Sequence, residues 1–245
     1  MIKTTAKLIE KKELTRNVFS FNLECLEIVA SCKAGQFINI LVEGFTLRRP
    51  ISICEITKNG IRIVFSVKGK GTKKMATWQE KKEIDIIAPL GNGFSNSKET
   101  DSILVIGGGL GVAPLLEVFK SKTKKIALLG FNRNEDVILK EDFEKYGKTI
   151  IYTNDGNQYE KGLVTKDLKK IIEKEKINKI KACGPEKMLD IIKSMAKEKK
   201  IECEISLEER MGCGFGACLC CQKILEKNNE KISFHVCKDG PIFVV

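Results

Sequence analysis

Hydrophobic and polar residues alternate along the first part of the chain, up to about residue 97. The alternation is clearest in FINILVE (37–43) and GIRIVFSV (60–67), and weaker in RNVFSFNL (16–23) and EIDIIAP (83–89). A period of two residues is typical of strands that bury one face. Many short strands at this spacing predict a small antiparallel β-barrel or sandwich.

A different rhythm begins at about residue 98, where short apolar runs alternate with helical patterns. The runs are SILVIGG (102–108), KIALLGF (125–131), TIIYT (149–153) and KIKACG (179–184). Strands that alternate with helices predict a parallel, doubly wound sheet.

Two of the helical patterns carry apolar residues at a spacing that places them on one face. In the segment 163–172 these residues are Val164, Leu168 and Ile171. In the segment 186–197 they are Met188, Ile191, Ile192 and Met195. We expect each set to form the buried face of its helix.

The patterns together predict three parts: a β-barrel domain at residues 1–97, an α/β domain at 98–203 and a small Cys- and Gly-rich domain at 204–245. A chain of 245 residues has the length of about one to two ordinary domains. No stretch approaches ~18 consecutive apolar residues, and the N-terminus lacks the apolar core of a signal peptide. We therefore expect a cytoplasmic protein without a membrane segment, whose ten cysteines stay reduced.

Four cysteines crowd into GCGFGACLCCQ (212–222), among glycines. Cys213, Cys218 and Cys221 have the spacing C-x4-C-x2-C, and Cys237 follows after fifteen residues. This is the plant-type [2Fe–2S] spacing, with three thiolates on one loop and a fourth farther along. Glycines allow such a loop to wrap a cluster closely and to point its backbone N–H groups at the sulfurs.

A structural zinc site is the alternative interpretation of these cysteines. Zinc sites usually pair cysteines as C-x2-C twice over, and this arrangement is absent, so the spacing favours iron–sulfur. Cys220 could compete with Cys221, but the C-x2-C step from Cys218 ends on Cys221, and we interpret Cys220 as a bystander. Four scattered cysteines are typical of small buried hydrophobic residues: Cys25, Cys32, Cys54 and Cys203.

The segment GGGLGVAPLL (107–116) follows a predicted strand and opens a predicted helix. In this context a glycine turn allows a pyrophosphate to rest on a helix N-terminus. Pro114 suits a first helical turn. The segment lacks the third glycine of the usual dinucleotide fingerprint and belongs to another branch of nucleotide binders.

A second candidate phosphate site lies in the β-rich part, in the segments LRRPISI (47–53) and VKGKGT (67–72). Arg49 could make a bidentate contact with a pyrophosphate. Ser52 could offer a hydroxyl to a ring nitrogen. Gly69, Gly71 and Thr72 could open a helix onto the same phosphates.

The net charge of +11 does not by itself indicate nucleic-acid binding. The lysines are interleaved with glutamates along predicted helices, as in KDLKKIIEKEKINK (166–179), which is typical of solvated helix faces. Binding to nucleic acid would need a concentrated basic stripe with stacking aromatic residues. The chain has one Trp and three Tyr, outside any such stripe, so we expect no nucleic-acid partner.

The motifs together resemble the ferredoxin reductase superfamily, and within it the electron-transfer subunits of type B dihydroorotate dehydrogenase. The resemblance covers essentially the whole chain. The matching segments follow in family order: AGQF (34–37), RRPIS (48–52), GKGT (69–72), PLGNGF (89–94), GGGLGVAPL (107–115), CGPEKML (183–189), ERMGCGFGACLCC (209–221) and CKDGPIF (237–243). It implies an N-terminal antiparallel FAD-binding β-barrel, a doubly wound parallel-sheet NAD domain and a small C-terminal plant-type [2Fe–2S] domain.

The resemblance also implies roles for individual residues. The FAD site would comprise Arg49, Pro50, Ile51, Ser52, Val64, Phe65, Ser66, Gly71 and Thr72. The NAD pyrophosphate would lie on Gly108, Gly109 and Gly111, and the mouth where nicotinamide meets flavin would be formed by Cys183, Gly184 and Pro185. The cluster ligands would be Cys213, Cys218, Cys221 and Cys237. Many superfamily members have an aromatic residue after the flavin arginine, where this chain has Pro-Ile, which would stack more weakly.

The family implies an NAD-linked flavin and iron–sulfur oxidoreductase subunit of pyrimidine biosynthesis. An FMN-containing catalytic partner would oxidise dihydroorotate, and electrons would pass through [2Fe–2S] and FAD to NAD⁺, in a heterotetramer of two plus two chains. The cofactors supply the redox chemistry, so we expect no catalytic acid–base residue. The single histidine, His235, sits beside a cluster ligand in ISFHVC.

Two other functions stay open on the sequence. One is a related NAD(P)H-dependent reductase of the same build that serves ferredoxin, sulfide or a hydrogenase. The other is a non-catalytic zinc- or nucleic-acid-binding module, which would be colourless where a flavin and iron–sulfur protein is yellow-brown. The nucleotide is open too, because Arg133 could bind the 2′-phosphate of NADP and Glu135 or Asp136 the 2′-hydroxyl of NAD.

Overall fold

The computed structural model describes residues 1–227 and 230–245. The chain divides into two units. One comprises Met1–Gly93 with Leu207–Ile242, and the other comprises Phe94–Ser206 with Phe243–Val245. The cysteine-rich segment therefore belongs to the same unit as the β-rich N-terminal segment.

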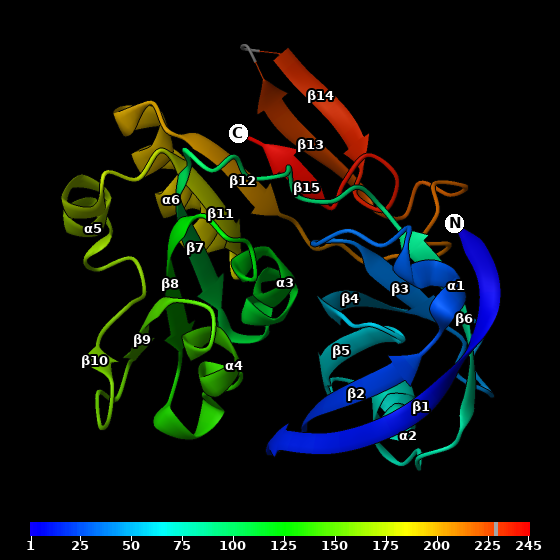
Figure 1. Cartoon of the computed structure of the whole chain (residues 1–245). Coiled ribbons are helices and arrows are strands. Elements are labelled where there is room, and N and C mark those ends of the chain that lie inside the picture. The colour runs from blue at the N-terminus through cyan, green and yellow to red at the C-terminus, as the bar shows by residue number, and fades with distance from the viewer. Residues whose placement is uncertain (228–229) are drawn as a thin grey trace. The chain divides into compact units, whose positions relative to one another are not determined.

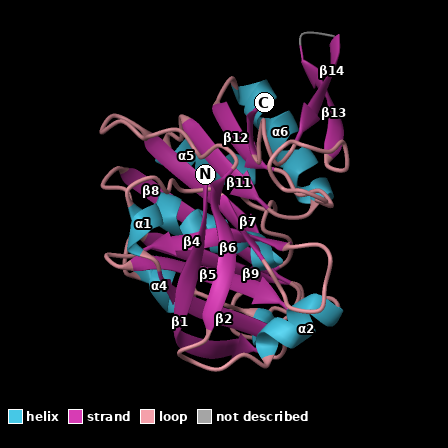
Figure 2. Ribbon diagram, turned by 90° about the vertical axis from the view of Figure 1, so that its right-hand side faces the viewer, coloured by secondary structure: helices cyan, strands magenta, loops and turns pink. Residues whose placement is uncertain are grey.

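The first unit contains a closed barrel of antiparallel strands in the order β1-β2-β5-β4-β3-β6, drawn from blue to cyan in Figure 1. The strands are β1 (Ile2–Thr15), β2 (Val18–Glu24), β3 (Phe37–Ile40), β4 (Arg49–Ile56), β5 (Gly60–Ser66) and β6 (Glu83–Leu90). Two short helices, α1 (Leu26–Val29) and α2 (Lys70–Ala76), connect them. Figure 2 shows how little of the barrel is helical. The predicted antiparallel barrel is thus confirmed.

Two barrel strands depart from the predicted alternation. β1 is long and mostly exposed, with only Ala6 and Leu8 buried, so its polar sequence gave no clear period of two. β3 is buried at all four positions rather than at alternate ones. The barrel core takes Ile38 and Ile40, and the other face of β3 is covered as well, since the Asn39 side chain reaches the cysteine-rich segment.

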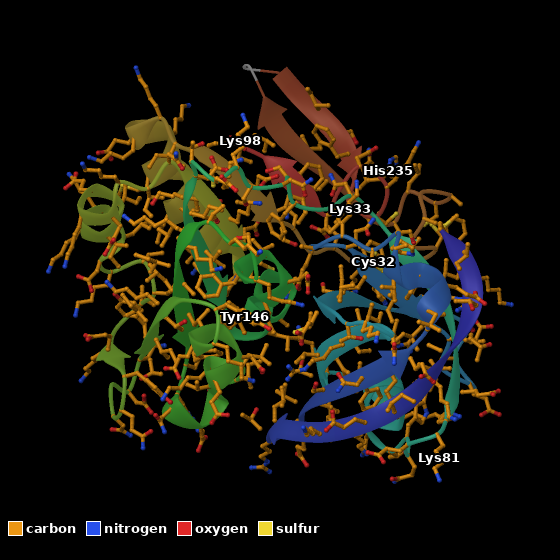
Figure 3. All side chains as sticks on the ribbon, viewed as in Figure 1. Cys32, Lys33, Lys81, Lys98, Tyr146 and His235 are labelled. Atoms are coloured by element: carbon orange, nitrogen blue, oxygen red, sulfur yellow. The ribbon has the colours of Figure 1, made fainter. Side chains whose placement is uncertain are left out.

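The C-terminal part of this unit is a cysteine loop followed by the hairpin β13 (Gln222–Lys227) and β14 (Glu230–His235). The two strands pair antiparallel. His235, labelled in Figure 3, is the last residue of β14. The Asn92 side chain donates hydrogen bonds to the carbonyl oxygens of Asp239 and Ile242, at 3.0 and 2.8 Å, so the end of β6 and the C-terminal part are tied together.

The second unit is built on a sheet with the strand order β10-β9-β8-β7-β11-β12-β15. The strands are β7 (Ser102–Gly108), β8 (Lys124–Phe131), β9 (Lys148–Thr153), β10 (Glu160–Lys161), β11 (Lys179–Cys183), β12 (Glu202–Ser206) and β15 (Ile242–Val244). Parallel pairing joins β7 to β8, β8 to β9, β7 to β11 and β11 to β12. The predicted parallel sheet is confirmed, and strand order reverses between β7 and β11.

Helices cover both faces of this sheet. They are α3 (Leu116–Phe119), α4 (Lys140–Glu144), α5 (Leu168–Glu175) and α6 (Glu186–Lys199), with 3₁₀ turns η1 (Gly109–Leu115) and η2 (Asn134–Asp136). Figure 1 shows α3 and α4 on one side of the strands and α5 and α6 on the other. No helix within the described residues is long and apolar enough to cross a membrane.

The predicted buried face of α6 was wrong at Ile191, and Met195 is only partly buried. Ile191 is 44% exposed, and the residues of α6 that are buried are Met188, Leu189, Ile192 and Ala196. The helix is turned so that this stripe packs on the sheet and Ile191 faces a pocket beside the glycine turn. Pro114 also differs from expectation, because it lies inside the 3₁₀ turn η1 and not in the first turn of an α-helix.

Candidate cofactor-binding sites

Arg49, the first residue of β4, points at the beginning of α2. A Cβ built on Gly71 would lie 2.2 Å from the Nε atom of Arg49, so the guanidinium occupies the space that a side chain at residue 71 would need. The guanidinium also lies over the ring of Phe45, 4.9 Å from its centre. The hydroxyl of Thr72 accepts hydrogen bonds from the backbone N–H groups of Lys68 and Gly69, at 3.0 and 3.2 Å. The positive charge of Arg49 therefore lies beside the first turn of α2.

The other residues predicted for FAD lie on neighbouring strands of the barrel. Cross-strand partners in β4 and β5 are joined at Ile53 and Ile63, which places residues 49–52 beside residues 64–66. Phe65 points into the barrel core, where its ring lies 4.9 Å from that of Phe21. The side chain of Phe65 is therefore part of the barrel core, and only its backbone remains for a ligand.

The two arginines of the RRP motif do different things. Arg48 is largely buried, and its guanidinium lies 2.6 Å from the carboxylate of Asp85. It also donates to the carbonyl oxygens of Asn39 and Asp85, each at 3.3 Å, so it ties β3 to β6. Sequence reasoning gave Arg48 no role, although a second arginine in an otherwise apolar segment was the available signal.

The six residues predicted for NAD lie together at the ends of β7 and β11. A Cβ on Gly111 would lie 2.5 Å from the carbonyl oxygen of Cys183, and a Cβ on Gly108 would lie 2.7 Å from Cδ of Pro185. Gly109 has φ +55°, a left-handed conformation that favours glycine. The turn at residues 108–111 therefore needs glycines in order to approach residues 183–185. Because strand order reverses between β7 and β11, this is the crevice where doubly wound sheets bind ligands.

A pocket of about 310 Å³ opens beside this turn. Its lining includes Gly108, Gly109, Phe131, Pro185, Met188 and Ile191. Such a mostly apolar pocket beside a glycine turn is suited to a nucleotide.

Arg133 and Glu135, two of the residues that could bind the ribose end of the nucleotide, contact each other. The guanidinium of Arg133 lies 3.2 Å from the carboxylate of Glu135, and both side chains are exposed. The backbone N–H of Arg133 donates to the carboxylate of Asp136 at 3.1 Å. The charge of Arg133 is therefore partly balanced within its own turn.

The four cysteines predicted as ligands lie as two pairs. The Sγ atoms of Cys221 and Cys237 are 3.3 Å apart, and both residues are 1% exposed. The thiols of Cys213 and Cys218, both half-buried, also interact. Cys220 is exposed. Within residues 1–227 and 230–245, no three or more metal-ligating side chains converge on one point.

Backbone N–H groups of the loop point at two of these sulfurs. Ala217 and Phe215 donate to Sγ of Cys213, at 3.2 and 3.5 Å, and Gly216 donates to Sγ of Cys237 at 3.1 Å. Gly216 has φ +88°, so the left-handed conformation that glycine allows is part of this turn.

The N–H donors change the acidity of Cys213. Burial raises the pKa of its thiol, but the backbone donors of Phe215, Cys218 and Ala217, with the Cys218 thiol, outweigh burial and bring the pKa to about 6. At Cys237, burial and then the adjacent Cys221 thiol raise the pKa to about 12. A thiolate is the form that binds metal.

These features define the class of protein: a reductase with the ferredoxin reductase-like fold, an NAD-binding domain and an iron–sulfur binding region. Among solved structures, the NADH-dependent reduced ferredoxin-NADP oxidoreductase matches with a TM-score of 0.85 and 23% identity, over 98% of this chain and 87% of that chain. Phthalate dioxygenase reductase matches with a TM-score of 0.62 and 18% identity, over 80% of this chain and 64% of that chain. Likenesses at this identity show the fold.

Sequence comparisons are more specific. The model for the iron–sulfur cluster binding domain of dihydroorotate dehydrogenase B matches residues 208–245, and that for the oxidoreductase NAD-binding domain matches residues 105–194. The electron transfer subunit of dihydroorotate dehydrogenase B (NAD(+)) from Bacillus cereus (strain G9842) is 37% identical over 100% of this chain and 98% of its own length. The same subunit from Clostridium perfringens (strain 13 / Type A) is 36% identical over 97% and 94%. The chain belongs to this family of electron-transfer subunits of dihydroorotate dehydrogenase B.

Proposed function

We propose that this subunit carries electrons from the FMN of a catalytic partner chain through a [2Fe–2S] cluster and FAD to NAD⁺. The observation that carries the proposal is the cysteine loop. It combines the C-x4-C-x2-C spacing with N–H groups that point at the sulfurs of Cys213 and Cys237. Family membership supplies the dihydroorotate dehydrogenase partner.

The donor set supports a [2Fe–2S] cluster held by Cys213, Cys218, Cys221 and Cys237. Such a cluster takes four cysteine thiolates on two irons, and the four thiols lie as two contacting pairs. The lowered pKa of Cys213 favours its thiolate at neutral pH. Cys220 lies outside these pairs and is exposed, which supports its interpretation as a bystander.

An FAD, when bound, would exchange a hydride with nicotinamide and single electrons with a cluster. Arg49 would hold its pyrophosphate, since the guanidinium is fixed between Phe45 and Gly71. Pro50, Ile51 and Ser52 would border the ring from β4. The backbone of Val64, Phe65 and Ser66 in β5, with Gly71 and Thr72, would complete the site.

The NAD pyrophosphate would rest on Gly108, Gly109 and Gly111, where a missing side chain brings the turn against Cys183. Cys183, Gly184 and Pro185 would border the nicotinamide. We further propose a functional division into FAD-binding residues 1–97, NAD-binding residues 98–203 and cluster-binding residues 204–245. Two of these chains would assemble with two catalytic chains in the cytoplasm.

Dihydroorotate-dependent NAD⁺ reduction by this chain mixed with an FMN-bearing catalytic chain tests the proposal, with each chain alone as a control. Activity in the mixture, and none from either chain alone, is expected. Dihydroorotate oxidation by this chain alone would contradict the assignment of the orotate site to the partner. The mixture could be inactive while flavin and cluster absorbance and NADH-dependent dye reduction persist. This result would assign the chain to the reductases that serve ferredoxin or another acceptor.

A further inference from the structure

Asn39 is a polar residue in the middle of the buried strand β3. Asn39 is only 1% exposed. The Nδ2 atom donates a hydrogen bond to the carbonyl oxygen of Cys213 at 2.9 Å. Two residues 174 positions apart in the sequence are thereby joined inside the first unit.

Stability alone does not explain the side-chain amide of Asn39. Its Oδ1 atom is buried and has no hydrogen-bond partner among the described residues. A buried polar atom without a partner costs free energy, whereas an apolar side chain of the same shape avoids the cost. Asn39 lies on the face of β3 opposite to Ile38 and Ile40, which pack into the barrel core, so a leucine at this position would remove the amide without changing that core.

The hydrogen bond holds the peptide from which the cysteine loop turns. Gly214 has φ +81°, and a Cβ on it would lie 2.4 Å from Nδ2 of Asn39. The N–H groups of Phe215 and Ala217, which follow directly, donate to Sγ of Cys213. A fixed Cys213 carbonyl therefore fixes the start of the turn that aims these donors at the sulfur.

The other end of the connection is the strand proposed to bind flavin. Asn39 is the cross-strand partner of Pro50 in β4, and cross-strand partners share one face of a sheet. The backbone carbonyl of Asn39 accepts from Arg48 at 3.3 Å. One residue thus contacts the RRPIS strand through its backbone and the first cluster cysteine through its side chain.

We infer that Asn39 is a positioning residue. It anchors the cysteine loop to β4, the strand proposed to bind flavin, and keeps the N–H groups of Phe215 and Ala217 directed at Sγ of Cys213. It acts through Cys213 and rests on the proposed function of that cysteine as a ligand. Hydrogen bonds to the sulfurs are among the factors that set a cluster's reduction potential. Because such donors stabilise the more negative reduced cluster, their loss makes the potential more negative.

The test uses Asn39→Leu in the full-length chain loaded with FAD and cluster. The readouts are the EPR spectrum and midpoint potential of the cluster, the rate of iron loss to a chelator, the FAD content and the melting temperature. We expect bound FAD to remain, the midpoint potential to become more negative, the EPR spectrum to change and iron to be lost several-fold faster.

Asn22→Leu is the matched control. Asn22 is a barrel asparagine whose Oδ1 likewise has no partner among the described residues, and its Nδ2 donates to Glu10, remote in sequence from the cysteine loop. This variant should leave the spectrum and potential of the cluster at their wild-type values, whatever it does to the melting temperature.

A wild-type spectrum, potential and iron-loss rate in Asn39→Leu would overturn the inference. Loss of the cluster from a folded variant that keeps FAD would support it. If Asn39→Leu does not fold, Asn39→Ala, which removes the donor without adding volume, decides by the same readouts. A wild-type chain without any cluster signal would contradict the proposed function itself, which separates the two failures.

Discussion

The guanidinium of Arg49 occupies the space that a side chain at Gly71 would need. A Cβ on Gly71 would lie 2.2 Å from Nε and 2.5 Å from Nη2 of Arg49. The two residues are 22 positions apart, in motifs that each look unremarkable alone. Their contact places a fixed positive charge beside the first turn of α2.

We predict that Gly71→Ala weakens FAD binding about tenfold or more without lowering the melting temperature. The new methyl group displaces the guanidinium of Arg49 and no backbone, so the fold is kept while the charged hydrogen bonds to the pyrophosphate are lost. Such bonds contribute about 1.5–3 kcal/mol, and about 1.4 kcal/mol corresponds to tenfold in affinity. Fluorescence titration of the apo-protein with FAD measures the effect. Gly69→Ala is the control, because a Cβ there meets nothing within 4 Å, and equal weakening by both variants would contradict the prediction.

Replacement of adjacent cysteines should separate a ligand from a bystander. Cys221 is 1% exposed and contacts Cys237, whereas Cys220 is exposed. We expect Cys221→Ser to lose most of its iron and its cluster absorbance, and Cys220→Ser to keep both. Iron analysis and visible spectra of the two purified variants provide the check. The reverse pattern would reassign the third ligand to Cys220.

Lys181 and Glu204 form a buried ion pair in the second unit. Nζ of Lys181 lies 3.5 Å from the Glu204 carboxylate and donates to the carbonyl oxygen of Ser95 at 2.5 Å. Ser95 in turn donates to Glu204 from its backbone N–H and its hydroxyl, each at 2.9 Å. Burial lowers the pKa of Lys181, and the Glu204 carboxylate opposes that shift.

Lys181→Met should lower the free energy of unfolding by about 3–5 kcal/mol, because it leaves the Glu204 carboxylate buried without its cation. Urea denaturation measures the loss. Lys193→Met, which removes an exposed pair with Asp190, should cost about 1 kcal/mol or less. Comparable losses in the two variants would show that burial does not govern the Lys181 pair.

Stability at alkaline pH should depend on Cys203. Burial first, and then the neighbouring Glu204 charge, raise the pKa of this fully buried thiol to about 12 from about 9. The unfolded chain releases the proton first, so this contribution to stability is complete below pH 9 and is lost between about pH 9 and 12. Relative to Cys203→Val, the wild type should lose up to about 1.4 kcal/mol per pH unit above 9. Urea denaturation at a series of pH values measures the slopes, and parallel curves for the two proteins would contradict the assignment.

Local patterns in the sequence predicted much of the fold. The short apolar runs that became β7, β8, β9 and β11 were recognised, because strands of a parallel sheet are buried on both faces and read as continuous apolar segments. β1 and β12 were not recognised. β1 is largely exposed, and β12 has only five residues and buries the charged Glu204, so neither forms a continuous apolar segment.

The orientation of elements could not be read in the same way. Ile191 has the same spacing as its buried neighbours in α6, yet it faces the pocket beside Gly108. Periodicity identifies an apolar stripe, but the partner surface decides which edge of the stripe is covered.

The sequence by itself determined the barrel, the parallel sheet, the cysteine spacing and the family, since each depends on neighbours within a few residues or on the order of motifs. Only the tertiary structure decided that Arg49 meets Gly71, that Gly111 meets Cys183 and that Asn39 reaches Cys213. These contacts join residues from 22 to 174 positions apart. Their partners are selected by which strands pair and how closely backbones approach, and no local pattern of hydrophobic and polar residues encodes that choice.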